Sequence, residues 1–99
     1  MYQCISIVTS KPEYTNNIIE AGKELSKIGK AEKGNIYYSV LRHTENPDTI
    51  IMIEKWESEK DFLAHVKNAG QIENPVHEFG ELVNRCAMDS KIYTCEILA

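Results

Sequence analysis

The order of predicted elements along the chain is β-α-β-β-α-β, which is typical of the α+β class and of the ferredoxin-like arrangement. Three patterns support this prediction: alternating apolar residues near both ends, a long amphipathic helix after the first strand, and two strands joined by a turn in the middle. Such an order forms an antiparallel four-stranded sheet with helices on one face. At 99 residues, we expect one domain over residues 1–99.

The two central strands and their turn occupy residues 34–58. Apolar residues fill both alternating sets of positions, so each strand is apolar on both faces. An Asn-Pro-Asp sequence provides the turn, because proline fixes φ and the Asx side chains bond to nearby backbone. A hairpin folded symmetrically about this turn pairs Tyr38 with Glu54 and Ile36 with Trp56.

The first strand is expected over residues 2–9, followed by a helix over residues 11–30. Ser10 is suited to cap this helix, with a proline in the first turn. Either Gly29 or Gly34 can adopt the positive φ that ends a helix.

A second helix is predicted over residues 59–68, where Ser58 is followed three positions later by an acid in a variant of the capping box. Its buried side is expected to carry Phe62, Leu63 and Val66.

A loop is then predicted from Ala69 to Glu73, and a third helix over residues 75–84 with Asn74 as its cap. Met88 to Ser90 is interpreted as a turn, and Lys91 to Leu98 as the last strand.

The composition excludes several classes of protein. With 15 acidic and 11 basic residues and no basic cluster, the chain lacks the charge pattern of a nucleic-acid binder. No apolar run is long enough to span a membrane, and the N-terminus lacks the regions of a signal peptide. We therefore expect a cytoplasmic protein with neither nucleic acid nor membrane as a partner.

The three cysteines, Cys4, Cys86 and Cys95, have no C-x-x-C spacing, which argues against a zinc site or a disulfide framework. Cys4 and Cys95 fall in predicted strands, where a free cysteine behaves as a small hydrophobe. The sequence also has no phosphate-binding loop, nucleophile elbow or dinucleotide fingerprint. No metal and no cofactor are therefore expected.

The apolar residues on both faces of the central strands predict self-association. Helices can cover only one face, and a large exposed apolar patch is rare on a soluble monomer. A second copy related by a two-fold axis can cover it. We expect a homodimer.

Among the histidines, His65 is the leading catalytic candidate, because it lies near the apolar edge of the second helix and imidazole titrates near neutrality. The alternative is a structural histidine bonded to backbone. His77, on the third helix, is a second candidate for the same cavity. His43, beside the turn, is expected to be solvated.

Glu54 lies in the middle of an apolar strand, where a carboxylate is costly unless it is paired. Arg42 and the Tyr38 hydroxyl are its expected partners, so we interpret it first as structural and second as an acid with a shifted pKa. Tyr38 and Trp56 can either pack in the core or line a pocket through their flat faces.

The sequence resembles the antibiotic-biosynthesis monooxygenase family. The resemblance is most detailed from Gly34 to His65 and the order of elements agrees along the whole chain. The matching positions are Gly34, Tyr38, Arg42, Pro47, Glu54, Trp56, Ser58, Ala64 and His65.

The resemblance implies a dimeric α+β barrel and a cofactor-independent oxygenase acting on a quinol or another electron-rich aromatic substrate. His65 would be the catalytic base, and Tyr38, Trp56, His77 and Phe62 would bind the substrate. Haem degradation is an alternative with His77 as axial ligand. Those relatives carry an asparagine on the first strand and a tryptophan on the second helix, whereas this chain has no asparagine from Tyr2 to Thr9 and has His65 at the tryptophan position. A non-catalytic dimer that binds a small ligand or a protein is the alternative from another class.

Overall fold

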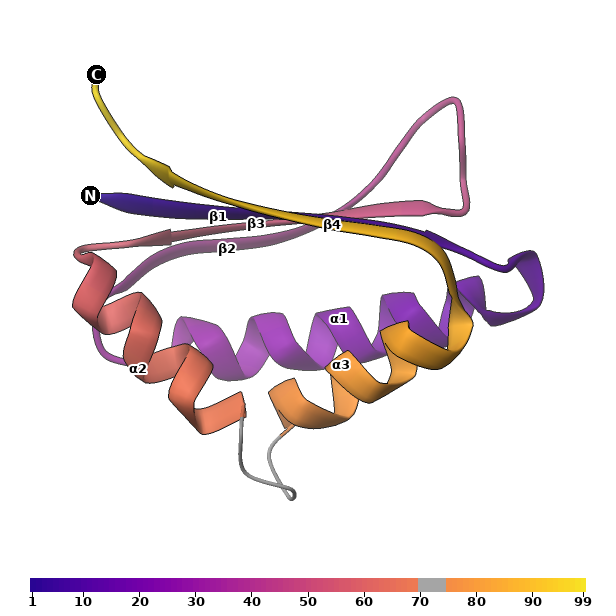
Figure 1. The fold of residues 1–99 in the computed structure, drawn as a ribbon, viewed down its shortest axis with the longest axis horizontal. Helices are drawn as coiled ribbons and strands as arrows, with labels where there is room; N and C mark the ends of the chain where they lie inside the picture. Colours follow the sequence, from indigo (N-terminus) through magenta and orange to yellow (C-terminus); the bar gives the residue numbers. More distant parts are fainter. Residues whose placement is uncertain (70–74) are drawn as a thin grey trace.

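A four-stranded antiparallel sheet forms one layer of the protein, and its helices form the other (Figure 1). The computed structural model describes residues 1–69 and 75–99, without the side chains of residues 68–77. The sheet has the order β2-β3-β1-β4, which confirms the predicted α+β, ferredoxin-like fold. In chain order, the elements are β1 (Tyr2–Ser10), the 3-10 helix η1 (Pro12–Tyr14), α1 (Thr15–Lys30), β2 (Asn35–Arg42), β3 (Thr49–Trp56), α2 (Glu59–Ala69), α3 (Pro75–Cys86) and β4 (Ala87–Glu96).

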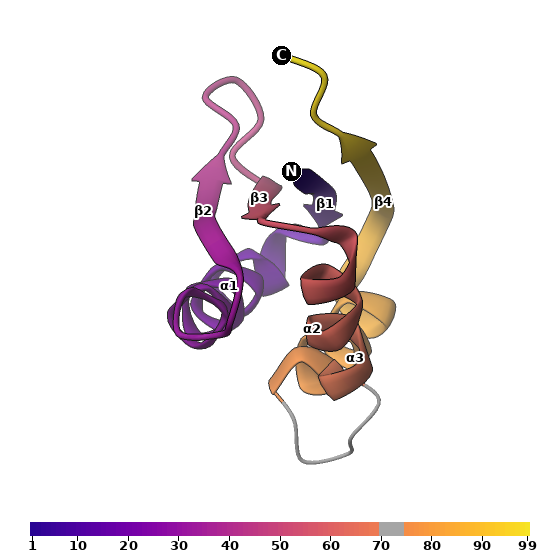
Figure 2. The ribbon, with the colours of Figure 1, turned by 90° about the vertical axis from the view of Figure 1, so that its left-hand side faces the viewer.

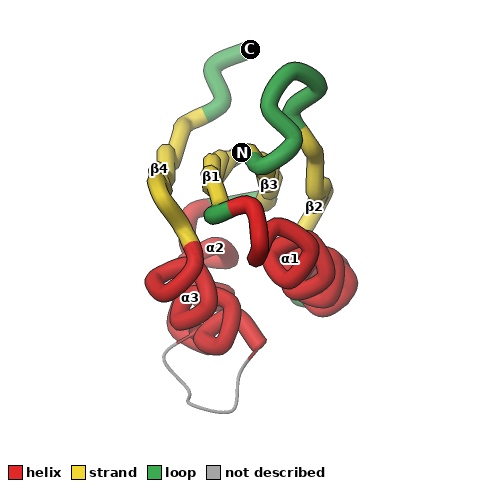
Figure 3. Tube along the Cα trace, turned by 90° about the vertical axis from the view of Figure 1, so that its right-hand side faces the viewer, coloured by secondary structure: helices red, strands yellow, loops and turns green. Residues whose placement is uncertain are grey.

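All three α-helices lie on the same face of the sheet. Viewed along the sheet, α1 lies below β2, and α2 and α3 lie below the side of the sheet that carries β4 (Figures 2 and 3). Residues of β1 and β3 that point toward the helices are buried, and those between them are only partly buried. The main core contains Val8, Ile18, Leu25, Tyr38, Ile50, Met52, Phe79, Val83 and Cys86. None of the described helices is long and apolar enough to cross a membrane.

The hairpin between β2 and β3 has the predicted pairing in its middle but not at its base. Tyr38 lies opposite Glu54, as predicted. Trp56 lies opposite Asn35 instead of Ile36, because the register shifts between Asn35 and Tyr37. One extra residue in a strand produces such a β-bulge.

The starts of the first two helices differ in how well the sequence predicted them. Ser58 accepts a hydrogen bond from the backbone N–H of Asp61 at 3.2 Å and donates its hydroxyl to Asp61 Oδ2 at 3.0 Å, so the predicted cap is present. Ser10 does not cap a helix, because its hydroxyl donates to the carbonyl of Lys11. The proline that follows instead starts a 3-10 turn, and α1 begins only at Thr15.

Two predictions about the second half of the chain are wrong. Leu63 and Val66 are exposed at 53% and 45%, and the buried side of α2 instead carries Phe62 and His65. The expected turn at residues 88–90 is part of β4, because α3 passes directly into the strand. The predicted cap Asn74 and most of the predicted loop at 69–73 lie outside the described residues; Ala69 itself ends α2.

Candidate active site

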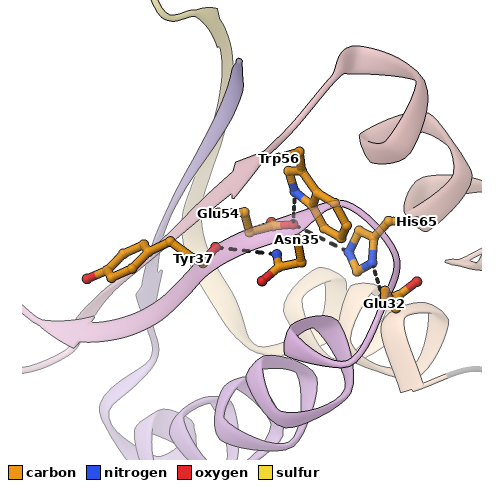
Figure 4. Close-up of polar contacts among 6 residues, drawn as sticks. All are labelled: Glu32, Asn35, Tyr37, Glu54, Trp56 and His65. Atoms are coloured by element: carbon orange, nitrogen blue, oxygen red, sulfur yellow. Dashed lines mark hydrogen bonds and ion pairs between the residues drawn. The ribbon is translucent and has the colours of Figure 1, made fainter.

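The most concentrated polar chemistry of the described chain is a buried network between β3, α2 and the end of α1 (Figure 4). Its centre is His65, whose Nδ1 lies 2.6 Å from Glu32 Oε1. The other ring nitrogen, Nε2, lies 3.4 Å from Glu54 Oε1. Trp56 donates its indole N–H to that same Glu54 oxygen at 3.3 Å. Both nitrogens of the imidazole therefore face carboxylates.

The secondary structure places these groups together. Glu54 and Trp56 are two residues apart on β3, so both point to the helix face of the sheet. His65 lies three residues after Phe62 on α2, so the two share the buried side of that helix. The rings of His65 and Trp56 are 4.9 Å apart and tilted by 37°. The imidazole is held between the sheet and the helix layer.

Glu32 reaches the network because the chain turns sharply after α1. Its backbone N–H bonds to the carbonyl of Gly29 at 3.1 Å. Gly34 then adopts φ +84°, and its carbonyl accepts the N–H of Glu57 at 2.8 Å. A side chain at residue 34 would collide with Asp61. Only glycine fits this tight corner without strain, and the corner brings Glu32 against α2.

Burial sets the electrostatics of the site. The side chains of His65 and Glu54 are 5% and 7% exposed, and that of Glu32 is 22% exposed. Loss of solvation raises the pKa of Glu54, and the nearby His65 and the Trp56 N–H oppose this rise. Burial, with Glu54 nearby, also raises the pKa of Cys4 to about 12 and the pKa of Tyr38 well above its usual value. The thiol and the phenol therefore stay neutral near pH 7.

A cavity of about 320 Å³ opens beside the network, between the sheet and the helices. Glu54, His65 and Tyr38 provide polar groups on its wall. The rest of the wall is mostly apolar and includes Val8, Leu25, Met52, Phe62, Phe79 and Val83. A pocket with an apolar wall and a few convergent polar groups is typical of a small-molecule site.

A larger groove of about 690 Å³ lies along the outside of α1 and β2, but it is a poorer candidate. It is lined largely by charged residues of α1 such as Lys23, Glu24 and Lys27, and it reaches neither His65 nor Glu54. Within residues 1–69 and 75–99, no three His, Cys, Asp or Glu side chains are placed to hold a metal ion.

The structure brings some of the candidate residues together and separates others. Tyr38, Phe62 and His65 line the cavity, as Glu54 does. Trp56 is fully buried and is not part of the cavity wall, so it can affect a ligand only through its neighbours.

The other predictions about polar side chains have different outcomes. Arg42 does not pair with Glu54: it is exposed at the end of β2, opposite Ile50. The Tyr38 hydroxyl was the other expected partner of Glu54, but His65 and the Trp56 N–H contact the Glu54 carboxylate instead. His43 is exposed, as expected, and its Nδ1 accepts backbone N–H groups of the turn. The side chain of His77 lies outside the described residues.

Glu32 is the residue of the network that the sequence did not indicate. One signal was present: an acid just beyond the end of a helix is unfavourable, because the helix dipole places negative partial charge there. Such an acid needs a compensating partner elsewhere, and here that partner is His65.

The ferredoxin-like fold, the inward-facing imidazole–carboxylate network and the largely apolar cavity define a small α+β domain with a polar cluster on the wall of its cavity. The family model for antibiotic biosynthesis monooxygenase matches residues 1–73. The chain belongs to that family.

Individual relatives agree with this assignment. The "Putative monooxygenase YcnE" of Bacillus subtilis (strain 168) is 29% identical over 59 residues, which cover 60% of this chain and 62% of that protein. The chain matches the structure of a "Putative antibiotic biosynthesis monooxygenase from Nitrosomonas europaea" with a TM-score of 0.87 and 20% identity, covering 100% of both chains. A similarly titled structure from Deinococcus radiodurans has a TM-score of 0.87 and 15% identity, with 100% of this chain and 94% of that chain covered. These two likenesses concern the fold.

Proposed function

We propose that this protein is a cofactor-independent monooxygenase that oxidises a hydroquinone or another electron-rich phenol in the cavity beside His65. The observation that carries the proposal is a cavity with a mostly apolar wall and one buried imidazole–carboxylate pair on that wall. Membership of the monooxygenase family favours oxygen chemistry over simple binding.

The size of the cavity suits an aromatic substrate. An apolar cavity of about 150 Å³ is enough to hold benzene. A cavity of about 320 Å³ therefore accommodates a substituted or fused aromatic ring. The rings of Phe62 and Phe79 on the wall provide flat apolar contacts.

The chemistry needs little from the protein beyond a base and a dry pocket. Loss of a proton makes a hydroquinone electron-rich enough to pass one electron to O₂. The resulting radical and superoxide combine to a hydroperoxide, which loses water. Overall, hydroquinone and O₂ give hydroxyquinone and water, so all atoms and electrons balance.

The residues of the site have matching roles in this proposal. The pair formed by His65 and Glu54 takes the proton from the substrate hydroxyl, with His65 as the proposed catalytic residue. The Tyr38 hydroxyl, kept neutral by burial, is able to donate a hydrogen bond to a substrate oxygen. Phe62 orients the ring, and the apolar wall excludes water from the radical pair.

We propose a homodimer as the working form. The helix-free face of the sheet carries partly buried isoleucines at 5, 7, 51 and 53, with the exposed residues Leu41 and Tyr93 beside them. A two-fold partner packing on this face removes the patch from water and leaves the cavity, on the other face, accessible.

An oxidation assay tests the function. Purified protein is mixed with methylhydroquinone in air, and oxygen uptake is measured after subtraction of uncatalysed autoxidation. We expect His65→Gln to lose about 10² to 10⁴ of the rate, because it breaks the imidazole–carboxylate pair that takes the substrate proton. Leu63→Gln, an exposed change on the same helix, should keep full activity. Tight binding of the hydroquinone without oxidation would instead indicate a non-catalytic binding protein.

A further inference from the structure

The hydrogen-bonding groups of the network determine where its protons lie. A carboxylate can only accept, and a neutral imidazole has one N–H and one acceptor nitrogen. Glu32 and Glu54 face the two nitrogens of His65 from opposite sides. When both carboxylates are ionised, the imidazolium is the form of His65 that gives each of them a favourable contact, a hydrogen bond to Glu32 and an ion pair with Glu54. The 2.6 Å contact to Glu32 fits a charge-assisted hydrogen bond.

We propose that Glu54 is the proton acceptor of the site and that Glu32 is a positioning residue that keeps His65 charged when Glu54 is neutralised. This inference rests on the proposed function. It assigns the proton to one member of the imidazole–carboxylate pair.

The balance of charge supports this division of roles. One imidazolium needs one counter-ion, but two carboxylates contact it. Glu54 lines the cavity and is therefore the carboxylate that a substrate can reach. When it takes a proton, the imidazolium still has Glu32 as its partner. Without Glu32, the same step leaves a cation unpaired in a nearly water-free site, which is costly.

The proton step is balanced. The O–H bond of the substrate breaks, a carboxylic acid forms at Glu54, and the substrate becomes a phenolate. The same proton then returns to the hydroperoxide oxygen that leaves as water. In its doubly protonated form His65 has no lone pair, so it cannot replace Glu54 as the acceptor in this step.

The surroundings of Glu54 favour this role. It is faced by His65 from α2, Tyr38 from β2 and Cys4 from β1, with Glu32 behind the imidazole. Burial raises its pKa, so its proton affinity lies closer to neutral pH, where a base is most effective. The Trp56 N–H holds one carboxylate oxygen in place.

Substitutions at the two carboxylates separate their roles. With methylhydroquinone as the probe, we expect Glu54→Gln to lower kcat about 10² to 10⁴-fold. Glu32→Gln should lower kcat about 10 to 100-fold, as expected for a lost charge-assisted bond, and Glu32→Asp should restore part of it. Glu24→Gln, an exposed acid on α1 with the same change of charge, should have no effect. An active Glu54→Gln protein together with an inactive His65→Gln protein would overturn the assignment.

A second measurement does not depend on activity. In protein labelled with ¹⁵N-histidine, with His65 assigned from the His65→Gln spectrum, we expect both ring nitrogens of the wild type to carry protons. Under the same conditions, only one ring nitrogen should carry a proton in Glu32→Gln. A neutral ring in the wild type, or an unchanged ring in Glu32→Gln, would contradict the proposal. If the wild type shows no oxidation above background, the proposed function fails, but this spectrum still tests the role of Glu32.

Discussion

The two faces of the sheet have different compositions and different neighbours. The helix face carries Glu54, Trp56, Tyr38 and Cys4 and is closed by α1, α2 and α3. The opposite face carries a central group of isoleucines at 5, 7, 51 and 53, and none of the described helices covers it (Figure 2). The buried polar groups therefore lie on the face that the helices cover, where the helices provide their partners. The face without helices is suited to association with another copy of the chain.

The difference between the two faces is clearest along β3, where successive residues point to opposite faces of the sheet. Ile50 is 1% exposed and belongs to the core, whereas Ile51 is partly exposed on the other face. Identical changes at these neighbours should therefore have very different effects.

The largest expected effect is on folding. Ile50→Asp places an unpaired charge in the core and should cost about 4 kcal/mol or more, enough to unfold a marginal domain. Ile51→Asp should retain the native circular dichroism spectrum and a cooperative urea transition. Equal losses of stability, measured at a concentration where both proteins are monomeric, would show that the two faces do not differ in this way.

The next effect concerns assembly. We expect the wild type to be a dimer at micromolar concentration that buries more than roughly 1,000 Å². Ile51→Asp should raise its dissociation constant about 100-fold or more, because the charge is desolvated at the interface. Sedimentation velocity measures this, with Leu98→Asp, at the exposed end of the chain, as the control. A monomeric wild type would refute the proposed dimer.

A third effect tests the corner that brings Glu32 to the helix face. Gly34→Ala should destabilise the protein by about 1 to 3 kcal/mol, because the residue has positive φ and a Cβ would meet Asp61. Gly80→Ala is the matched control: beyond the adjoining backbone of α3, no atom of the described residues lies within 4 Å of its added Cβ, and alanine should stabilise α3 by about 0.5 to 1 kcal/mol. Urea unfolding measures both. Equal changes in the unfolding free energy of the two variants would mean that a side chain at residue 34 does not strain the corner.

The smallest effect is a pH dependence of stability. Burial raises the pKa of Glu54 above its ordinary value of 4.5, so the folded state binds this proton more tightly than the unfolded state. The contribution of Glu54 to stability is therefore complete below pH 4.5 and is lost as the pH rises through the raised pKa.

Glu54→Gln removes this titration. The difference in unfolding free energy, wild type minus variant, should fall as the pH increases above 4.5. The groups facing Glu54, which are His65, Glu32, Tyr38 and Cys4, remain in both proteins. A difference that rises with pH would show that pairing with His65 outweighs the cost of burial.

The sequence predicted the elements of the fold because each has a local signal. Ser58 shows a cap, Gly34 provides a positive φ, and the Asn-Pro-Asp turn sets the pairing of Tyr38 with Glu54. The bulge near Ile36 has no such signal, since it depends on how the hairpin base fits the helix layer. The direct passage from α3 into β4 was missed for a similar reason, because tertiary pairing with β1 extends the strand.

The candidate site was predicted only in part. Hydrophobic periodicity predicted that Leu63 and Val66 are buried, but His65 takes the buried side of α2 with Phe62, and Leu63 and Val66 are exposed. The partners of Glu54 were also missed. His65 meets Glu54 only because α2 folds back under β3, and Trp56 donates to it from two residues further along the same strand. The turn at Gly34 brings Glu32 to His65, and the position of β3 in the sheet brings Glu54 to it. Both contacts therefore depend on the tertiary structure.

We propose that the helix face of the sheet houses an oxygenase site, and isotope labelling tests this claim. Methylhydroquinone is incubated with the protein under ¹⁸O₂, and the product is analysed by mass spectrometry with oxygen uptake measured in parallel. We predict one ¹⁸O atom in a hydroxyquinone product and one O₂ consumed per substrate, with both lost in Glu54→Gln. A product without ¹⁸O, formed at the rate of autoxidation by wild type and variant alike, would contradict the claim.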